Sequence, residues 1–94
     1  MVLGNESQAW TRLEGESIVP VDAAIVMEHL VLAATAEGLG TCWICAFERA
    51  KLDQILNLTG SPWKSVAMTP LGYSRAEPRQ NQSKPLSELF EVID

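Results

Sequence analysis

Apolar residues are most dense between positions 22 and 47, and the rest of the chain is arranged around this stretch. Residues 23–37 contain no Gly or Pro and are rich in Ala, Leu, Met and Glu, a composition that favours helix. Apolar residues occur on nearly every side of this helix, which is typical of a helix buried on most of its surface. Gly38 ends it, and the strand-forming run 41–45 follows. The pattern predicts a central helix packed on two sides.

The polar positions of this helix indicate where it lies. Pro20 and Asp22 stand at its start, and the Asp22 carboxylate suits an N-cap or first-turn position, where it meets the positive end of the helix dipole. Glu28 and His29 interrupt the apolar run, which is also too short to span a bilayer. We therefore expect the core helix of a soluble protein and no membrane association.

The pattern on either side of the helix predicts smaller elements. Residues 13–19 are polar and lack periodicity, so we expect a loop. Residues 48–56 predict a short helix, because apolar side chains recur there at helical spacing. Residues 64–73 are predicted to form a strand. Pro70 removes one main-chain donor from it, so the strand lies at a sheet edge or is bulged at that point.

The C-terminal segment combines a polar and an amphipathic part. Residues 74–84 are polar without periodicity and are expected to be extended over a surface. Pro85 suits the first turn of a last helix. An apolar stripe with helical spacing follows, and it must dock on some surface: Leu86, Leu89, Phe90 and Ile93.

Length and charge narrow the function classes. The chain has 94 residues, which corresponds to one domain at most. Its formal net charge of −5 disfavours a nucleic-acid partner, because phosphate binding needs clustered Lys and Arg. No basic segment precedes an apolar one in the way of a secretory signal. With no signal and only 2 cysteines, we expect a reducing, cytoplasmic environment.

Cys42 and Cys45 form a C-x-x-C pattern that has two interpretations. The first is a redox dithiol or half of a metal site. A zinc site needs about four ligands, and the chain offers only His29 besides the cysteines, so we expect no metal. The second is a pair of small buried residues in a strand, whose side chains would point to opposite faces.

Four sequence segments resemble the second half of the FMN-dependent nitroreductase family, in order, spacing and residue type. They are Asp-Ala-Ala-Ile (22–25), His-Leu-Val-Leu-Ala-Ala (29–34), Gly-Leu-Gly-Thr-Cys-Trp-Ile (38–44) and Ala-Phe (46–47); Leu-Gly-Tyr (71–73) resembles the family's closing motif. The resemblance implies an α+β fold, the C-terminal half of a nitroreductase-like fold with a long central helix and a small mixed or antiparallel sheet. Residues 1–94 would then be a single domain, truncated at its N-terminus.

The resemblance also implies a flavin contact. In this family the strand-to-helix segment, here Cys42, Trp43, Ile44, Cys45 and Ala46, lies along the flavin. Trp43 and Ile44 would pack near the ring, and the backbone N–H groups around Cys45 and Ala46 would face flavin N5 and O4. Fixed donors at those atoms stabilise the reduced flavin, so no side chain of this chain need be catalytic. The family usually has Gly where Cys45 stands.

The tail departs from the family's pattern. Members often carry a Lys-x-Arg pair that holds the FMN phosphate just before the final Pro-Leu, and the matching positions here are Asn81 and Ser83. Lys84 and Arg79 are the nearest cations. The resemblance therefore places Ser83 and Lys84 at the phosphate, with weakened FMN binding.

The implied activity is transfer of two electrons, as hydride, from NAD(P)H through FMN to a nitro compound, quinone or similar small-molecule acceptor. The implied assembly is a homodimer, or a complex with a complementing N-terminal half. Two alternatives stay open. One is a non-catalytic flavin-binding or assembly fragment of the same fold, and the other is a small redox or metal protein that uses the C-x-x-C pattern.

Overall fold

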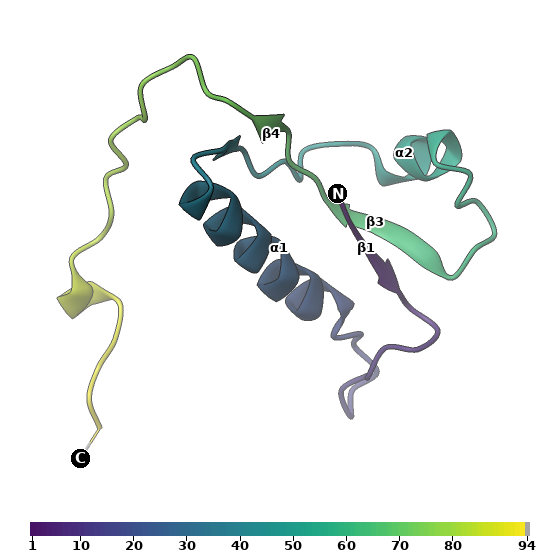
Figure 1. Cartoon of the computed structure of the whole chain (residues 1–94). Helices are drawn as coiled ribbons and strands as arrows, with labels where there is room; N and C mark the ends of the chain where they lie inside the picture. The colour runs from purple at the N-terminus through teal and green to yellow at the C-terminus, as the bar shows by residue number, and fades with distance from the viewer. Residues whose placement is uncertain (94) are drawn as a thin grey trace.

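The computed structural model describes residues 1–93 and combines helices with two small strand pairs in an α+β arrangement (Figure 1). Strand β1 (Val2–Asn5) pairs antiparallel with β3 (Trp63–Ala67). Strand β2 (Gly40–Thr41) pairs antiparallel with β4 (Leu71–Gly72). The expectation of a small antiparallel sheet beside a long helix is therefore confirmed, although the strands are divided between two pairs.

The helices are α1 (Val19–Ala36) and α2 (Arg49–Ile55), and a 3₁₀ turn, η1 (Leu86–Glu88), lies in the tail. Helix α1 runs along the β1–β3 pair and reaches the β2 end of the second pair, whereas α2 lies at the far side of β3 (Figure 1). The short helix predicted over 48–56 is confirmed, with Glu48 and Leu56 as its capping residues.

The ends of α1 follow from local chemistry. The helix begins at Val19, within the segment that we expected to be loop, because Pro20 suits its first turn. Asp22 lies in the first turn, one of its two expected places. At the other end Gly38 adopts a φ of 72°, and its N–H donates to Thr35 O at 3.0 Å. Leu39 N–H donates to Ala34 O at 2.8 Å, completing a Schellman cap that turns the chain into β2.

The core lies between α1 and the β1–β3 pair. Its buried members are Val2, Ala23, Met27 and Ala67, and Val66 packs against them. At Gly4 a side chain would overlap Val19 Cγ1, so the absence of a Cβ lets the start of α1 approach β1. One face of α1 is thereby fixed to the sheet.

The prediction that α1 is packed on two sides is wrong for the described chain. Its buried residues are Val19, Ala23, Met27 and Ala34, and large apolar side chains stay exposed on the remaining surface: Val21, Ile25, Val26 and Leu32. The physical reason is that residues 1–93 provide one thin layer of strands and nothing to cover the other side. Exposed apolar surface of this kind marks an interaction site.

Helix α1 also corrects the expectation that the apolar run is too short for a bilayer. The helix is long and apolar enough to cross a membrane by length and composition alone, and it is the one such helix among residues 1–93. Core helices of soluble proteins pass the same test, so this property is weak evidence for a membrane location. The packing of Met27, which is fully buried against the strands, matches a core helix.

Pro70 interrupts the predicted strand 64–73 as expected. Strand β3 ends at Ala67, Met68 forms one isolated bridge to Ile44, and β4 begins at Leu71 after the proline. The chain thus passes from one strand pair to the other at Pro70, because the proline lacks the main-chain N–H that a continuous ladder needs.

The predicted last helix is wrong. Residues 74–84 form neither helix nor strand, as expected, but they are exposed and do not run over a surface of the described chain, so that part of the prediction is wrong. Residues 85–93 contain only the short η1 turn, and the side chains of the apolar stripe are exposed. A short helix is marginal in water unless its apolar face docks, and the described chain offers the stripe no surface. Figure 1 shows the tail leaving the strands and helices altogether.

Candidate functional site

The segment Cys42–Ala46, which we call the ring segment, connects β2 to α2 and is held by the end of β3. Cys42 N–H donates to Thr69 Oγ1 at 2.8 Å. Ile44 N–H donates to Met68 O at 2.9 Å, and Met68 N–H returns a hydrogen bond to Ile44 O at 3.1 Å. The segment is therefore pinned at two points to the chain just before Pro70.

The strand predicted over 41–45 is only partly present. Strand β2 ends at Thr41, and beyond it only Ile44 forms a bridge, so Cys42, Trp43 and Cys45 lie outside any strand. The prediction extended the strand too far, because Thr, Trp and Ile favour strand only where a partner strand runs beside them. Both cysteines are free and exposed, which also corrects the interpretation that they are buried.

The ring segment carries hydrogen-bond donors that the described chain leaves unused. The backbone N–H groups of Trp43, Cys45 and Ala46 have no acceptor within residues 1–93. Phe47 N–H, by contrast, donates to Cys45 O at 3.0 Å. The Trp43 side chain is 40% exposed and Ile44 is half-buried. The segment thus offers donors beside apolar side chains, the combination that an aromatic heterocycle with ring nitrogen and carbonyl groups requires.

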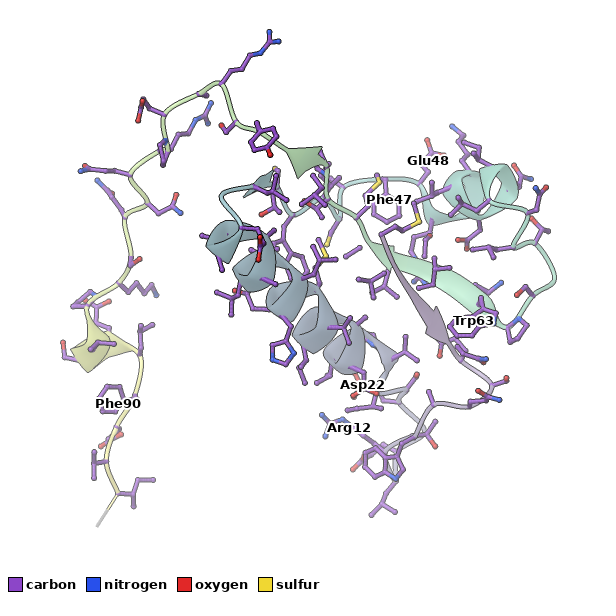
Figure 2. The ribbon with its side chains drawn as sticks, viewed as in Figure 1. Arg12, Asp22, Phe47, Glu48, Trp63 and Phe90 are labelled. Carbon is purple, nitrogen blue, oxygen red and sulfur yellow. The ribbon has the colours of Figure 1, made fainter. Side chains whose placement is uncertain are left out.

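The end of the segment leads into α2, which is attached to the same strand. Figure 2 shows Phe47 and Glu48 where the chain enters this helix. Asp53 Oδ1 accepts a hydrogen bond from Ser65 N–H at 2.9 Å, and Arg49 Nε donates to Ser65 O at 3.0 Å. Both side chains come from one face of α2, because they are four positions apart. Helix α2 is thus fixed to β3 at Ser65.

Asp53 is the buried carboxylate of this contact, with 7% of its surface exposed. The Ser65 hydroxyl lies beside it without meeting hydrogen-bond geometry, and is the first cause that lowers the pKa of Asp53; the hydrogen bond from Ser65 N–H is the second. Burial opposes this, while the positive charges of Lys64 and Arg49 add to the lowering of the pKa. The carboxylate is therefore ionised at neutral pH.

Sequence reasoning missed the Asp53–Arg49–Ser65 contact. The available signal was the i, i+4 pair of opposite charges on α2, but such pairs usually lie on the solvated face of a helix. In the structure the apolar residue Ile55 is 77% exposed while Asp53 is buried, so helical spacing identified the wrong buried face.

Ser83 and Lys84, the other predicted cofactor-binding residues, lie in the extended tail and are exposed. Figure 1 shows this part of the tail away from the connection between β2 and α2, and Phe90 in Figure 2 marks how far the tail continues. Arg79 and Asn81 lie in the same extended stretch. The described chain therefore does not bring the two groups of predicted site residues together.

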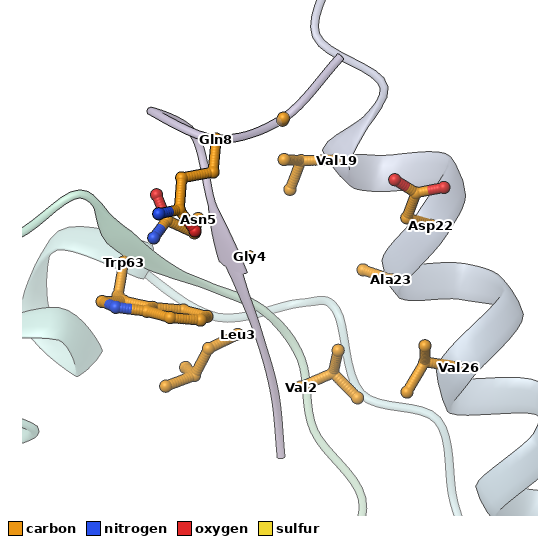
Figure 3. A pocket seen from close by; sticks show the side chains of 11 residues that line it. Val2, Leu3, Gly4, Asn5, Gln8, Val19, Asp22, Ala23, Val26 and Trp63 are labelled. Atoms are coloured by element: carbon orange, nitrogen blue, oxygen red, sulfur yellow. The ribbon is translucent and has the colours of Figure 1, made fainter.

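The described surface has cavities at several places. One of about 310 Å³ lies between β1 and the start of α1, and its lining includes Asn5, Gln8, Asp22 and Trp63 (Figure 3). A second of about 390 Å³ borders Arg49, Asp53 and Lys64. A third, of about 280 Å³, adjoins the ring segment: it is lined by β2, β4 and their neighbours, including Cys42 and Tyr73.

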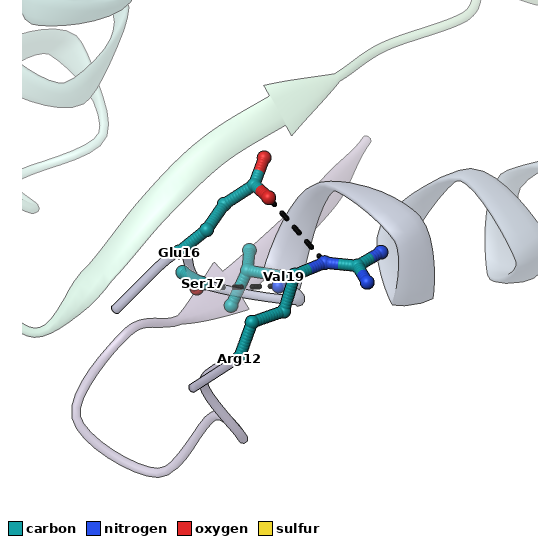
Figure 4. A network of polar contacts seen from close by, with 4 residues as sticks. All are labelled: Arg12, Glu16, Ser17 and Val19. Carbon is teal, nitrogen blue, oxygen red and sulfur yellow. Dashed lines mark hydrogen bonds and ion pairs between the residues drawn. The ribbon is translucent and has the colours of Figure 1, made fainter. Parts of the chain in front are cut away.

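The loop before α1 is ordered by a small polar network (Figure 4). Arg12 Nε lies 3.3 Å from Glu16 Oε2, and both side chains are mostly exposed, so the pair contributes little to stability. Ser17 Oγ accepts a hydrogen bond from Val19 N–H at 3.3 Å, where the helix begins. This network sets the entry of the chain into α1. No cluster of three or more His, Cys, Asp or Glu that could hold a metal occurs in residues 1–93.

Comparison with known families decides the identity of the fold. The model of the nitroreductase family matches residues 6–73, a range that contains every core residue except Val2, together with the ring segment and the Leu-Gly-Tyr of residues 71–73. This chain belongs to the nitroreductase family. The resemblance read from the sequence is thereby confirmed.

Solved structures of nitroreductase family proteins share the fold. A nitroreductase family protein from Clostridium difficile 630 matches with a TM-score of 0.88 and 27% identity over 97% of this chain and 56% of its own. One from Clostridium novyi NT matches with a TM-score of 0.65 and 42% identity over 76% of this chain and 39% of its own. The chain thus spans about half, or less, of these relatives. Among the curated proteins no match was found.

A third nitroreductase family protein, from Streptococcus pneumoniae TIGR4, is similar in fold. It has a TM-score of 0.73 and 24% identity over 79% of this chain and 36% of its own. The chain thus shares both its family and its fold with solved nitroreductase family proteins.

Proposed function

We propose that this chain binds FMN at the ring segment and takes part in two-electron transfer from NAD(P)H to a nitro compound, quinone or similar acceptor. The observation that carries the proposal is the set of unpartnered N–H donors at Cys45 and Ala46, within the residues that match the family. When bound, FMN supplies hydride transfer at its N5 atom, and the protein supplies binding and electrostatics.

The residues of the ring segment would act by binding and orienting. The N–H groups of Cys45 and Ala46 would donate to N5 and O4 of the flavin, where negative charge gathers on reduction. Donors held in place by the backbone stabilise that charge without having to reorganise. Trp43 and Ile44 would cover the ring and exclude water from it. This role needs no acid or base from a side chain, so none is proposed as catalytic.

The phosphate end of FMN would meet Ser83 and Lys84, and here the fit is poor. Both residues are exposed in the extended tail, and neither Asn81 nor Ser83 carries the positive charge that the family places there. Lys84 can supply one cation, but as a compact point charge without the two-pronged geometry of Arg. We therefore propose that FMN is held mainly at its ring.

The partner would be a second copy of the chain or a complementing N-terminal half. Supporting this proposal are the uncovered apolar face of α1 and the exposed stripe in the tail, together with the half-length match to the relatives. We further propose a cytoplasmic location, with residues 1–94 as a single nitroreductase-like domain. Its substrates would be NAD(P)H and a small-molecule acceptor.

A non-catalytic flavin-binding or assembly protein is the second candidate. It is favoured by the absence of a positive charge at Asn81 and Ser83. Weak FMN binding would lower turnover while leaving the fold intact. The C-x-x-C alternative has less support, because the nitroreductase fold accounts for the segment that contains both cysteines.

Reconstitution with FMN tests the proposal. The purified protein is mixed with FMN and desalted, and its visible spectrum and its NADH and NADPH oxidation are then measured. A retained flavin spectrum with oxidation stimulated by a quinone or nitro compound supports the enzyme. A flavin spectrum without oxidation supports the non-catalytic candidate, and absence of any flavin binding refutes both.

A further inference from the structure

Ser65 on β3 is fully buried, and α2 provides the partners of its main-chain groups. Its N–H donates to Asp53 Oδ1 at 2.9 Å and its C=O accepts from Arg49 Nε at 3.0 Å. Within residues 1–93, strand β3 pairs with β1 and with no second strand, so these two groups lie on an edge that no described strand covers. Unpaired main-chain groups on a buried edge cost free energy. The side chains of Asp53 and Arg49 thus make the hydrogen bonds that a neighbouring strand would otherwise make.

The chain that follows β3 also holds the ring segment. Beyond Ser65 the chain continues to Met68 and Thr69, whose groups bind Ile44 and Cys42. The stretch Cys45–Glu48 is therefore attached at both ends to the segment 65–69, through Ile44 at Met68 and through Arg49 and Asp53 at Ser65. The unused N–H donors of Cys45 and Ala46 lie between these two attachments.

We propose that Asp53 and Arg49 are positioning residues that hold the Cys45 and Ala46 N–H groups in place for a flavin ring. The inference rests on the proposed function, and it assigns a role to residues outside the ring segment. Asp53 is buried and accepts from a main-chain N–H, and hydrogen bonds to an ionised group are the stronger ones. Losing this attachment frees the start of α2 and, with it, one end of the stretch that carries the donors.

Three substitutions in the full chain test the proposal: Asp53→Ala, Asp53→Asn and Arg49→Met. Asn keeps an oxygen that accepts from Ser65 N–H, so Asp53→Asn is the matched control. FMN and riboflavin are titrated into each protein by fluorescence, and the visible band of each bound flavin is recorded. Asp53→Ala is expected to weaken both flavins about tenfold, the effect of one lost hydrogen bond, and to shift the visible band.

Smaller effects on flavin affinity are expected for the control Asp53→Asn and for Arg49→Met. Asp53→Asn should bind both flavins within about threefold of the wild type, since the Ser65 hydrogen bond is kept. Arg49→Met should weaken both flavins by a smaller factor than Asp53→Ala. Arg49 is exposed whereas Asp53 is buried, so Arg49→Met decides the matter if Asp53→Ala does not fold.

Equal effects on FMN and riboflavin separate this role from a phosphate effect, because riboflavin has the same ring and no phosphate. Wild-type affinities and an unshifted visible band in both Arg49→Met and the folded Asp53→Ala protein would overturn the proposal. In the flavin-free protein, the amide NMR shifts of Cys45 and Ala46 should move in Asp53→Ala and Arg49→Met but stay in Asp53→Asn. If the wild type binds no flavin, the proposed function fails, and these shifts alone decide the positioning role.

Discussion

The two ends of the proposed flavin site differ in how much of their structure the chain itself supplies. The ring segment is hydrogen-bonded to Met68 and Thr69, and its following helix is fixed at Ser65. The tail segment, residues 79–84, has neither helix nor strand and is exposed throughout. The family match follows the same division, since it ends at residue 73.

This difference indicates which half of the flavin the chain can organise alone. Backbone donors between two attachments are preorganised, so binding a ring there costs little conformational entropy. A tail without helix, strand or buried contacts must be fixed in place when it binds a ligand, and that ordering reduces the affinity gained from any phosphate contact. The ring should therefore dominate recognition. The predictions below test this comparison, beginning with the largest expected effect.

The first prediction separates the folded body from the tail by stability. Met27 is fully buried, so Met27→Ala should lower the free energy of unfolding by about 2–5 kcal/mol, through lost burial and a cavity. Phe90 in the tail is 63% exposed, and Phe90→Ala in the isolated chain should change the same quantity by no more than about 0.5 kcal/mol. Urea unfolding of both variants measures this. Equal losses would mean that the tail packs on the body.

The second prediction restores charge to the tail segment. Ser83→Arg, alone or with Asn81→Lys, should tighten FMN binding by one to two orders of magnitude, because one charge-assisted hydrogen bond contributes roughly 1.5–3 kcal/mol. Riboflavin should bind almost as before, and high salt should reduce the gain. Fluorescence titration of both flavins decides this. If FMN binds no better, or both flavins gain equally, the tail does not reach the phosphate.

The third prediction concerns the surfaces that remain uncovered. The exposed side chains of α1 and the tail stripe make a large apolar surface, so the chain should form a dimer or larger assembly, with at least about twice the monomer mass. Light scattering on a size-exclusion column measures the mass. A monodisperse monomer at micromolar concentration would show that these surfaces need no partner.

The smallest expected effect is a loss of unfolding free energy at acidic pH that depends on the Asp53 carboxylate. The pKa of Asp53 in the folded chain lies below its ordinary value of 3.8, so the unfolded chain takes up this proton first as the pH falls. The stabilisation from the carboxylate is therefore complete above that value and is lost as the pH falls through the folded pKa. Comparing urea unfolding of wild type and Asp53→Asn at about pH 7 and about pH 3 should show a smaller acid loss in the variant. Equal losses of unfolding free energy in the two proteins would contradict the lowered pKa of Asp53.

Much of the fold could be predicted from sequence, because its signals are local. Gly38 ends α1 through its positive φ, Pro70 divides the last strand, and the composition of residues 23–36 favours helix locally. Sequence patterns that form an element only when it packs on another surface predicted the fold less well. The tail stripe has the spacing of a helix, yet no surface in residues 1–93 receives it, and only a 3₁₀ turn forms.

The site was less predictable for the same reason. The ring segment is found by its motif, but the attachment that fixes its far end joins residues 12 and 16 positions apart, Asp53 and Arg49 with Ser65. Sequence spacing cannot show which face of α2 meets β3, and the apolar positions of that helix indicated a different face. The unused donors at Cys45 and Ala46 became apparent only once the partners of Ile44 and Phe47 were assigned.

The most direct test of the account is the affinity of the unmodified chain for the two flavins. We predict that FMN and riboflavin both bind and quench on titration, with dissociation constants within about threefold of each other, because the ring is held and the phosphate contributes little. FMN binding at least about a hundredfold tighter than riboflavin would contradict the account, because the tail segment would then be organising the phosphate end.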